Sequence, residues 1–376
     1  MDFFTRCEII PYINAHDTYT VYGGSRMSEN TAEAMRQVSR HFVNIEQMQR
    51  TLGKKLAVMT QNEAAYITNG ASGGMLLATA VCMAQSDVYR YSKLPETMGF
   101  PNEVIVMRAQ RNAYDKAITA AGAQLIEVGD ADETLAFELE GSIHEKTAAI
   151  FYFASTLYSR GSMPLQETIA IAHRHHVPVI VDAAAQLPPV ENLWKFTQMG
   201  ADLVIFSGGK TLCGPQNSGL MVGRKDMIED CIRFGAPVHG ICRSSKVSRE
   251  AMAGLFVAVE EYLQMNQTEN TARLLHYDIS LSEAIEKTGA ASCEIVPYGP
   301  VGQTYPRVFA FLNRAESAEQ VRQEMLARHI YIGTDCTRNA IYISPLNLNK
   351  DELQIVMRNL VEVLQLVDTK EGNRDA

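Results

Sequence analysis

Residues 201–223 read ADLVIFSGGKTLCGPQNSGLMVG, two apolar runs on either side of a glycine-rich turn that carries Lys210. The runs at 202–206 and 219–223 have the length and composition of buried strands. From residue 56 to residue 223, similar apolar runs alternate with helical patterns such as those at 73–84 and 165–176. The further candidate strands are 64–68, 103–107, 123–128, 148–153 and 177–182. This alternation is typical of strands joined by crossover helices. The predicted fold class is therefore α/β, with a mostly parallel central sheet flanked by helices.

The pattern changes after residue 245. A long amphipathic helix predicted at 249–267 leads to candidate strands at 307–312 and 340–345, and helices are expected near 317–328 and 350–367. This mixture predicts a smaller α+β domain at the C-terminal end. We therefore expect three parts: an N-terminal segment at 1–45, a large α/β domain at 46–245 and a small α+β domain at 246–376.

The composition excludes several classes of protein. The 376-residue chain has 46% apolar residues and a net charge of −9, and its lysines and arginines do not cluster as nucleic-acid contacts require. No apolar run approaches the roughly 18 residues that a membrane span needs, and the first residues do not resemble a secretion signal. We therefore expect a cytoplasmic protein without a membrane or nucleic-acid partner, transfer RNA included.

Metal binding has little support. The seven cysteines form no C-x-x-C pair, so neither a zinc ribbon nor a disulfide scaffold is indicated. His173, His175 and His176 lie close together, but they fall on a predicted helix away from the strand ends. We interpret them as a solvated helix face and predict no metal.

Lys210 can be a phosphate clamp or a nucleophilic amine. A P-loop requires glycine five positions before the glycine that precedes the lysine, and that position is Val204. No G-x-G-x-x-G motif follows a predicted strand either, so a dinucleotide site has no support. The amine interpretation is favoured.

Two further elements lie where predicted strands end. VPVIVDAAAQ at 177–186 places Asp182 at the carboxyl end of a strand, where α/β sheets bind ligands, although such an aspartate can also cap a turn. YITNGASGG at 66–74 is a strand-to-helix turn of small residues, and its backbone N–H groups and Ser72 hydroxyl can approach an anion. Glycine-rich turns also occur for packing reasons alone.

Together these elements match the needs of pyridoxal 5'-phosphate. This cofactor requires an amine for covalent attachment, an anion against its ring nitrogen and a phosphate site. Lys210, Asp182 and the turn at 66–74 supply the three, and Ser207 adds a phosphate contact. We predict pyridoxal 5'-phosphate as the cofactor.

The sequence resembles a known family at this point. It is similar to fold-type-I pyridoxal-phosphate enzymes related to bacterial selenocysteine synthase, and within them to the D-glucosaminate-6-phosphate ammonia-lyase subgroup. The resemblance is carried by TNGASGG, by QRNAYDKAI at 110–118, by FSGGKTLCGPQNSGLMVG at 206–223 and by CRSSKVSREAMAGL at 242–255. INAHDTYTVYGGSRMSENTAEAM at 13–35 and the segment 164–193 extend it over most of the chain.

The resemblance implies roles for residues near the strand ends. It makes Lys210 the Schiff-base lysine and Asp182 the partner of the ring nitrogen. The other residues that it places at the cofactor are Ser72, Gly73, Ser155, Gln186 and Ser207. Arg111 falls where related enzymes stack a side chain on the ring, and a surface salt bridge is an equally good interpretation of this arginine.

Four cations are candidates for substrate binding. Arg26 follows two glycines near the expected active site, although the same segment can be a simple helix entry capped by Ser28 or Asn30. The other three are Arg243, Lys246 and Arg338. Related enzymes place an arginine of the small domain against the substrate carboxylate, and here Tyr342 lies closer to that position than Arg338 does.

The resemblance implies an ammonia-lyase acting on a phosphorylated β-hydroxy amino acid. The expected reaction converts D-glucosaminate 6-phosphate to 2-keto-3-deoxygluconate 6-phosphate and ammonia in a homodimer or larger homo-oligomer. Departures from the family pattern at His16, Asp17, Gln110 and Arg249 leave the substrate open. The alternatives are β-elimination of a sulfur amino acid, racemisation, aldol cleavage, a selenocysteine-synthase-like transfer, or a non-enzymatic regulatory protein on the same fold.

Overall fold

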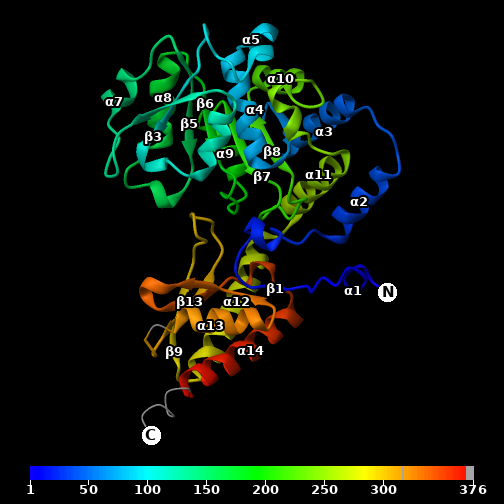
Figure 1. Ribbon diagram of the computed structural model, residues 1–376, viewed down its shortest axis with the longest axis vertical. Helices are drawn as coiled ribbons and strands as arrows, with labels where there is room; N and C mark the ends of the chain where they lie inside the picture. The colour runs from blue at the N-terminus through cyan, green and yellow to red at the C-terminus, as the bar shows by residue number, and fades with distance from the viewer. Residues whose placement is uncertain (316, 370–376) are drawn as a thin grey trace. The chain divides into compact units, whose positions relative to one another are not determined.

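The computed structural model describes residues 1–315 and 317–369, and its elements are labelled in Figure 1. Its contacts divide the chain into a larger unit, Ser25–Gln264, and a smaller unit made of Met1–Gly24 and Met265–Ala376. These boundaries differ from the expected ones at 45/46 and 245/246. The reason is that α2 (Glu29–Ser39) and α3 (Ile45–Met59) both pack against α11 (Arg249–Gln264).

Within the described residues, the larger unit contains a seven-stranded sheet in the order β2-β8-β7-β6-β5-β3-β4. Only β8 runs antiparallel to its neighbours. The strands are β2 (Ala64–Thr68), β3 (Glu103–Met107), β4 (Gln124–Val128), β5 (Thr147–Phe153), β6 (Val179–Asp182), β7 (Leu203–Ser207) and β8 (Gly219–Gly223). Each lies in an apolar run that predicted it, and the mostly parallel α/β fold is confirmed.

Helices cover both faces of this sheet. Val179 and Val181 of β6 belong to one core cluster, and Ile180 between them belongs to the other. The first cluster includes side chains of α3, α8 (Leu165–Arg174) and α11, and the second includes those of α4 (Gly70–Ala84) and α10 (Lys225–Phe234). Strands buried on both faces need apolar residues at every position, which explains why they appear in the sequence as continuous runs.

The smaller unit has its own core. Four antiparallel strands lie in the order β12-β13-β10-β9, with α12 (Gln267–Glu286), α13 (Ala318–Ala327) and α14 (Lys350–Thr369). The strands are β9 (Ala291–Val296), β10 (Arg307–Leu312), β12 (Gly333–Asp335) and β13 (Ala340–Ile343). The N-terminal strand β1 (Ile13–Asn14) joins this unit by pairing in parallel with β11 (Ile330–Tyr331). This is the predicted α+β part of the chain.

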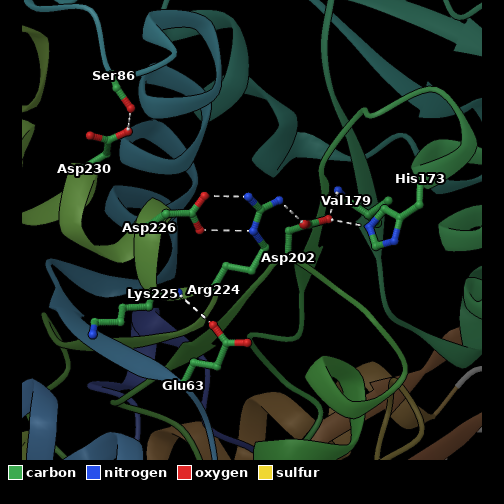
Figure 2. Close-up of polar contacts among 9 residues, drawn as sticks. All are labelled: Glu63, Ser86, His173, Val179, Asp202, Arg224, Lys225, Asp226 and Asp230. Atoms are coloured by element: carbon green, nitrogen blue, oxygen red, sulfur yellow. Dashed lines mark hydrogen bonds and ion pairs between the residues drawn. The ribbon is translucent and has the colours of Figure 1, made fainter.

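A buried carboxylate ties together the amino ends of β6 and β7, as Figure 2 shows. Asp202 accepts hydrogen bonds from the Val179 N–H at 2.8 Å, and its carboxylate lies 2.9 Å from His173 Nε2 and 2.8 Å from Arg224 Nη1. Arg224 also binds Asp226. His173, His175 and His176 are all exposed, so the predicted solvated helix face is confirmed, and His173 also contacts the buried Asp202.

Candidate active site

Lys210, Asp182, Ser207 and the turn at 66–74 gather at the opposite edge of the large sheet. Because β2, β5, β6 and β7 all point the same way, their carboxyl ends share one edge. Thr68 at the end of β2 and Ser207 at the end of β7 both pair with Gly219, and Asp182 ends β6 beside Phe153 of β5. Ligands of open α/β sheets bind at such an edge. Lys210, Asp182 and the first turn of α4 all follow these strand ends.

Lys210 lies on a tightly packed turn between β7 and β8. The Gly208 N–H donates to the Ser218 carbonyl at 2.8 Å, and the Cys213 N–H donates to the Lys210 carbonyl at 2.9 Å. A Cβ on Gly208 would lie 2.1 Å from Ser218 Oγ, and one on Gly209 would lie 2.5 Å from the Gln216 Cα. Only glycine fits at both positions, so the two glycines allow the turn to hold the lysine firmly.

This lysine turn is bonded directly to the turn that follows β6. Thr211 Oγ1 donates to the Leu187 carbonyl at 2.9 Å, and the Ser207 N–H donates to the Ala184 carbonyl at 3.3 Å. The two loops that carry the proposed amine and the proposed carboxylate are thus held in one rigid arrangement.

Asp182 is a half-buried carboxylate with a raised pKa. Burial raises the pKa, while a hydrogen bond from the Ala184 N–H to Oδ1 at 2.9 Å and the positive charge of Lys210 oppose the rise. Removal of the carboxylate from water disfavours its charged form unless a cation is near. A protonated ring nitrogen would be such a cation, so the position suits the cofactor role predicted for it.

The first turn of α4 has the shape of an anion cradle. Asn69 precedes the helix without making a side-chain cap, and the left-handed Gly70 (φ 66°) opens the turn. A Cβ on Gly73 would lie 3.4 Å from the Asn69 Cβ and 3.5 Å from the Ser245 Cβ. Ser72 is exposed in the same turn. N–H groups at a helix start attract phosphate, and these residues therefore fit the phosphate of pyridoxal phosphate.

Other predicted cofactor contacts have local roles in the structure. Ser155 follows β5, and its Oγ accepts the Leu157 N–H at 3.2 Å to cap the short helix η4 (Thr156–Tyr158). The Gln186 carbonyl accepts a hydrogen bond from Asn192 Nδ2 at 2.6 Å. Their contacts with a cofactor stay predictions.

Arg111 forms a salt bridge, which was one of the two roles expected for it from the sequence. Its Nε lies 2.6 Å from the Oδ2 of the buried Asp115, and its Nη1 pairs with Glu127. Stacking of its guanidinium on a cofactor ring stays a prediction.

The segment that carries Arg26 lies beside the lysine turn. The Ser25 N–H donates to the Gly209 carbonyl at 3.0 Å. Ser28 caps α2 by accepting the Thr31 N–H at 3.0 Å, as one interpretation of the segment predicted. The segment therefore both caps α2 and contacts the turn that carries Lys210. Substrate binding by Arg26 stays a prediction.

Arg243 and Lys246 lie on and directly after the short helix η5 (Ile241–Ser245), which contacts α4. Both side chains are exposed, and neither pairs with a carboxylate of the residues that the structure describes. Their charges remain available to a ligand near the cradle. Arg338 differs, because its Nε binds Asp335 at 2.7 Å in the smaller unit and its guanidinium covers the Phe309 ring.

A tyrosine and histidine array in the smaller unit was not predicted. His16 Nε2 lies 2.6 Å from the hydroxyl oxygen of Tyr342, and His16 Nδ1 lies 2.9 Å from the hydroxyl oxygen of Tyr22. Burial, followed by the charges of Arg307 and Arg322, lowers the pKa of His16 to about 4. The ring is therefore neutral at pH 7. The sequence signals were the departure at His16 and the position of Tyr342 near the usual arginine site, and these residues are too far apart in the chain to be linked without the fold.

The described residues contain no group of three or more metal-ligating side chains arranged around one point, and none of the helices in 1–315 and 317–369 has the length and apolar character to span a membrane.

Comparison with known proteins gives relatives along nearly the whole chain. The 5'-C-glycyluridine monooxygenase-decarboxylase of a Streptomyces species is 32% identical over 369 residues, which cover 95% of this chain and 90% of the relative. The D-glucosaminate-6-phosphate ammonia lyase of Salmonella typhimurium is 29% identical over 364 residues, which cover 94% and 95%.

Solved structures agree with the sequence comparison. The structure of a D-glucosaminate-6-phosphate ammonia-lyase superposes with a TM-score of 0.85 at 27% identity, covering 98% of this chain and 99% of that one. A serine palmitoyltransferase solved with bound PLP superposes with a TM-score of 0.59 at 15% identity, covering 95% and 88%, and shows the same fold. The family model described as L-seryl-tRNA selenium transferase, SelA, matches residues 13–290. The chain, a fold-type-I protein, belongs to the L-seryl-tRNA selenium transferase (SelA) family.

Proposed function

We propose that the protein is a cytoplasmic pyridoxal-phosphate enzyme with Lys210 as its covalent attachment point. The observation that carries this proposal is the convergence of an amine, a carboxylate and an uncapped helix start at one edge of one sheet. The cofactor needs those three groups, and they come from three separate strand ends.

Each group has a defined task in this proposal. Pyridoxal phosphate, when bound, supplies an electron-accepting ring for the electron pair released at the substrate α-carbon. Asp182 keeps the proton on the ring nitrogen, and the first turn of α4 with Ser72 and Ser207 holds the phosphate. Lys210 takes the proton from the α-carbon, because a neutral amine is a competent general base.

The reaction that we propose is ammonia loss from a β-hydroxy amino acid, with D-glucosaminate 6-phosphate as the substrate. The β-hydroxyl leaves as water, one water is consumed as the amine is released, and the products are 2-keto-3-deoxygluconate 6-phosphate and ammonia. The similarity to the Salmonella ammonia lyase supports this choice. Arg26, Arg243 and Lys246 would supply positive charge for the substrate phosphate and carboxylate.

A second candidate is oxygen-dependent decarboxylation of an amino acid. The 32% identity to the glycyluridine monooxygenase-decarboxylase favours it. Glucosaminate, a glycyl-substituted nucleoside and a seryl group all contain an α-amino acid unit, so the proposed cofactor site serves either reaction. The part of the substrate beyond that unit decides between them.

Absorbance tests the cofactor assignment. The wild-type protein incubated with pyridoxal phosphate should develop a covalent band at about 410–430 nm. Lys210→Ala should lack this band, whereas Lys225→Ala, which removes an exposed lysine after β8, should keep it. A Lys210→Ala protein that retains the band would refute the assignment.

Product analysis tests the reaction. The loaded enzyme should release equal amounts of ammonia and keto acid from D-glucosaminate 6-phosphate, both with and without oxygen. Oxygen uptake with carbon dioxide release from an aminoacyl nucleoside would favour the second candidate. Sedimentation velocity should give at least a dimer, since related sites form between subunits.

A further inference from the structure

We infer that Ser245 is a further phosphate-binding residue of the cofactor site, a role that rests on the proposed function. Ser245 is the last residue of η5 and was not among the residues predicted from the sequence. Its position relative to α4 carries the inference.

The Ser245 side chain lies over the first turn of α4. A Cβ on Gly73 would lie 3.5 Å from the Ser245 Cβ and 4.0 Å from Ser245 Oγ. Both residues line one small hollow, together with Thr68, Asn69 and Cys242. Any larger residue at position 73 would narrow this hollow between the helix start and the serine.

The position of Ser245 is fixed, but its hydroxyl has no protein partner. Cys242 on one side and Val247 on the other are 2% and 8% exposed, so both anchor the segment in the core. Ser245 itself is half-buried, and its Oγ makes no hydrogen bond to the residues described in 1–315 and 317–369. A hydroxyl without a protein partner, close to a helix start that has no side-chain cap, is suited to an anion that accepts hydrogen bonds from both.

The charges beside Ser245 point to the same kind of ligand. Arg243 and Lys246 flank it in the chain, and neither has a carboxylate partner within the described residues. The helix start, the hydroxyl and two cations together favour a dianionic phosphate over a carboxylate. The phosphate of the cofactor is the group that the proposed site brings to this turn.

Binding measurements with two forms of the cofactor test this role. The dissociation constants of pyridoxal phosphate and of pyridoxal, which lacks the phosphate, are measured by absorbance titration for wild type, Ser245→Ala and Ser244→Ala. Ser244 is the exposed neighbour and serves as the matched control. Loss of one hydrogen bond to a charged group should weaken pyridoxal phosphate binding by about tenfold in Ser245→Ala, with pyridoxal binding unchanged. Ser244→Ala should bind both like wild type.

Further variants separate phosphate binding from a structural effect. Ser245→Thr keeps the hydroxyl and should retain wild-type affinity, and Ser245→Asp should lose more affinity for pyridoxal phosphate than Ser245→Ala because of charge repulsion. Equal weakening of pyridoxal and pyridoxal phosphate, or no weakening of either, would overturn the inference while leaving the cofactor assignment intact. Failure of the wild-type protein to bind pyridoxal phosphate would overturn both.

Discussion

At the scale of single residues, Asp182 combines a cost in stability with a proposed use. Its pKa is raised by burial, so the folded state binds the proton more tightly than the unfolded state does. The stability from that proton is complete below the ordinary pKa of 3.8 and is lost as the pH rises through the folded pKa. Above the folded pKa, the charged carboxylate therefore lowers the stability of the cofactor-free protein.

Asp182→Asn should consequently stabilise the cofactor-free protein and impair the enzyme. Without cofactor, the substitution should raise the thermal midpoint more at pH 8 than at pH 4. High pH favours the charged form of the buried aspartate, whereas asparagine carries no charge at either pH. With cofactor and substrate, kcat should fall on the order of a hundredfold, since a buried charge pair is lost. Calorimetry and steady-state assays check both parts, and an unchanged kcat would contradict the assigned role.

Gly208→Ala should loosen the lysine turn. Its Cβ would lie 2.1 Å from Ser218 Oγ and 2.7 Å from the Leu255 Cδ1, so we expect a loss of about 1–3 kcal/mol in the free energy of unfolding. Gly141→Ala is the control, because nothing lies within 4 Å of the added carbon. Urea unfolding compares the two, and equal stabilities would show that the turn adapts without cost.

The positions of Lys210 and Asp182 were predictable, because Asp182 ends an apolar run that forms a strand and Lys210 follows another. Ser245 was not predictable, because its relation to Gly73 depends on how η5 folds back onto α4. For Arg111, the sequence was compatible with two roles, ring stacking and a salt bridge. The structure contains the salt bridge, to Asp115.

At the scale of elements, helix α12 has an aspartate, Asp278, on its buried face. Leu274, Asp278, Leu281 and Ile285 are all buried, and both carboxylate oxygens of Asp278 lack a hydrogen-bond partner in the described chain. Burial raises the pKa of Asp278 to about 8. The side chain is therefore protonated in the folded protein at neutral pH.

Asp278→Asn should remove a pH dependence of stability. In the wild type, the contribution of Asp278 is complete below pH 4 and is lost as the pH rises toward 8 and beyond. At about 1.4 kcal/mol per pKa unit, this loss is on the order of 5 kcal/mol. Urea unfolding of both proteins between pH 4 and 8 measures it. The same slope in the asparagine variant would show that another group is responsible.

The longer helices and strands were predictable from the sequence, whereas the shortest strands were not. All seven strands of the large sheet, together with α4, α8, α13 and α14, lie where apolar patterns predicted them. The two-residue strands β1 and β11 are too short to produce a pattern. The helix predicted to run from residue 249 to 267 stops at Gln264, and α12 begins after Asn266, whose side chain caps it.

At the scale of the whole molecule, the smaller unit is built from both ends of the chain. Residues 1–24 contribute β1, the fully buried Ala15 and the Asp17 that accepts from the Tyr305 hydroxyl. The sequence could not show this, because no local pattern links the first residues to the last third. The predicted boundary at 45/46 therefore missed the division at 24/25.

Deletion of residues 1–18 should destabilise the smaller unit alone. Hydrogen exchange of β10 and β13 should accelerate by at least about tenfold, since roughly 1.4 kcal/mol corresponds to a factor of ten, while β6 and β7 of the larger unit should exchange as before. Deletion of residues 1–12 is the control, because it leaves β1 in place. Acceleration in both units would indicate that the chain unfolds as one cooperative body.

The discontinuous smaller unit also sets an order for biosynthesis. The ribosome makes residues 1–24 before residues 25–264, yet Ile330 and Tyr331, with which β1 pairs, are made after both segments. Residues 25–264 are complete well before then and can collapse on their own, since domains generally fold as units during translation. The segment 1–24 therefore lacks its strand partner until residues 330–331 have left the ribosome.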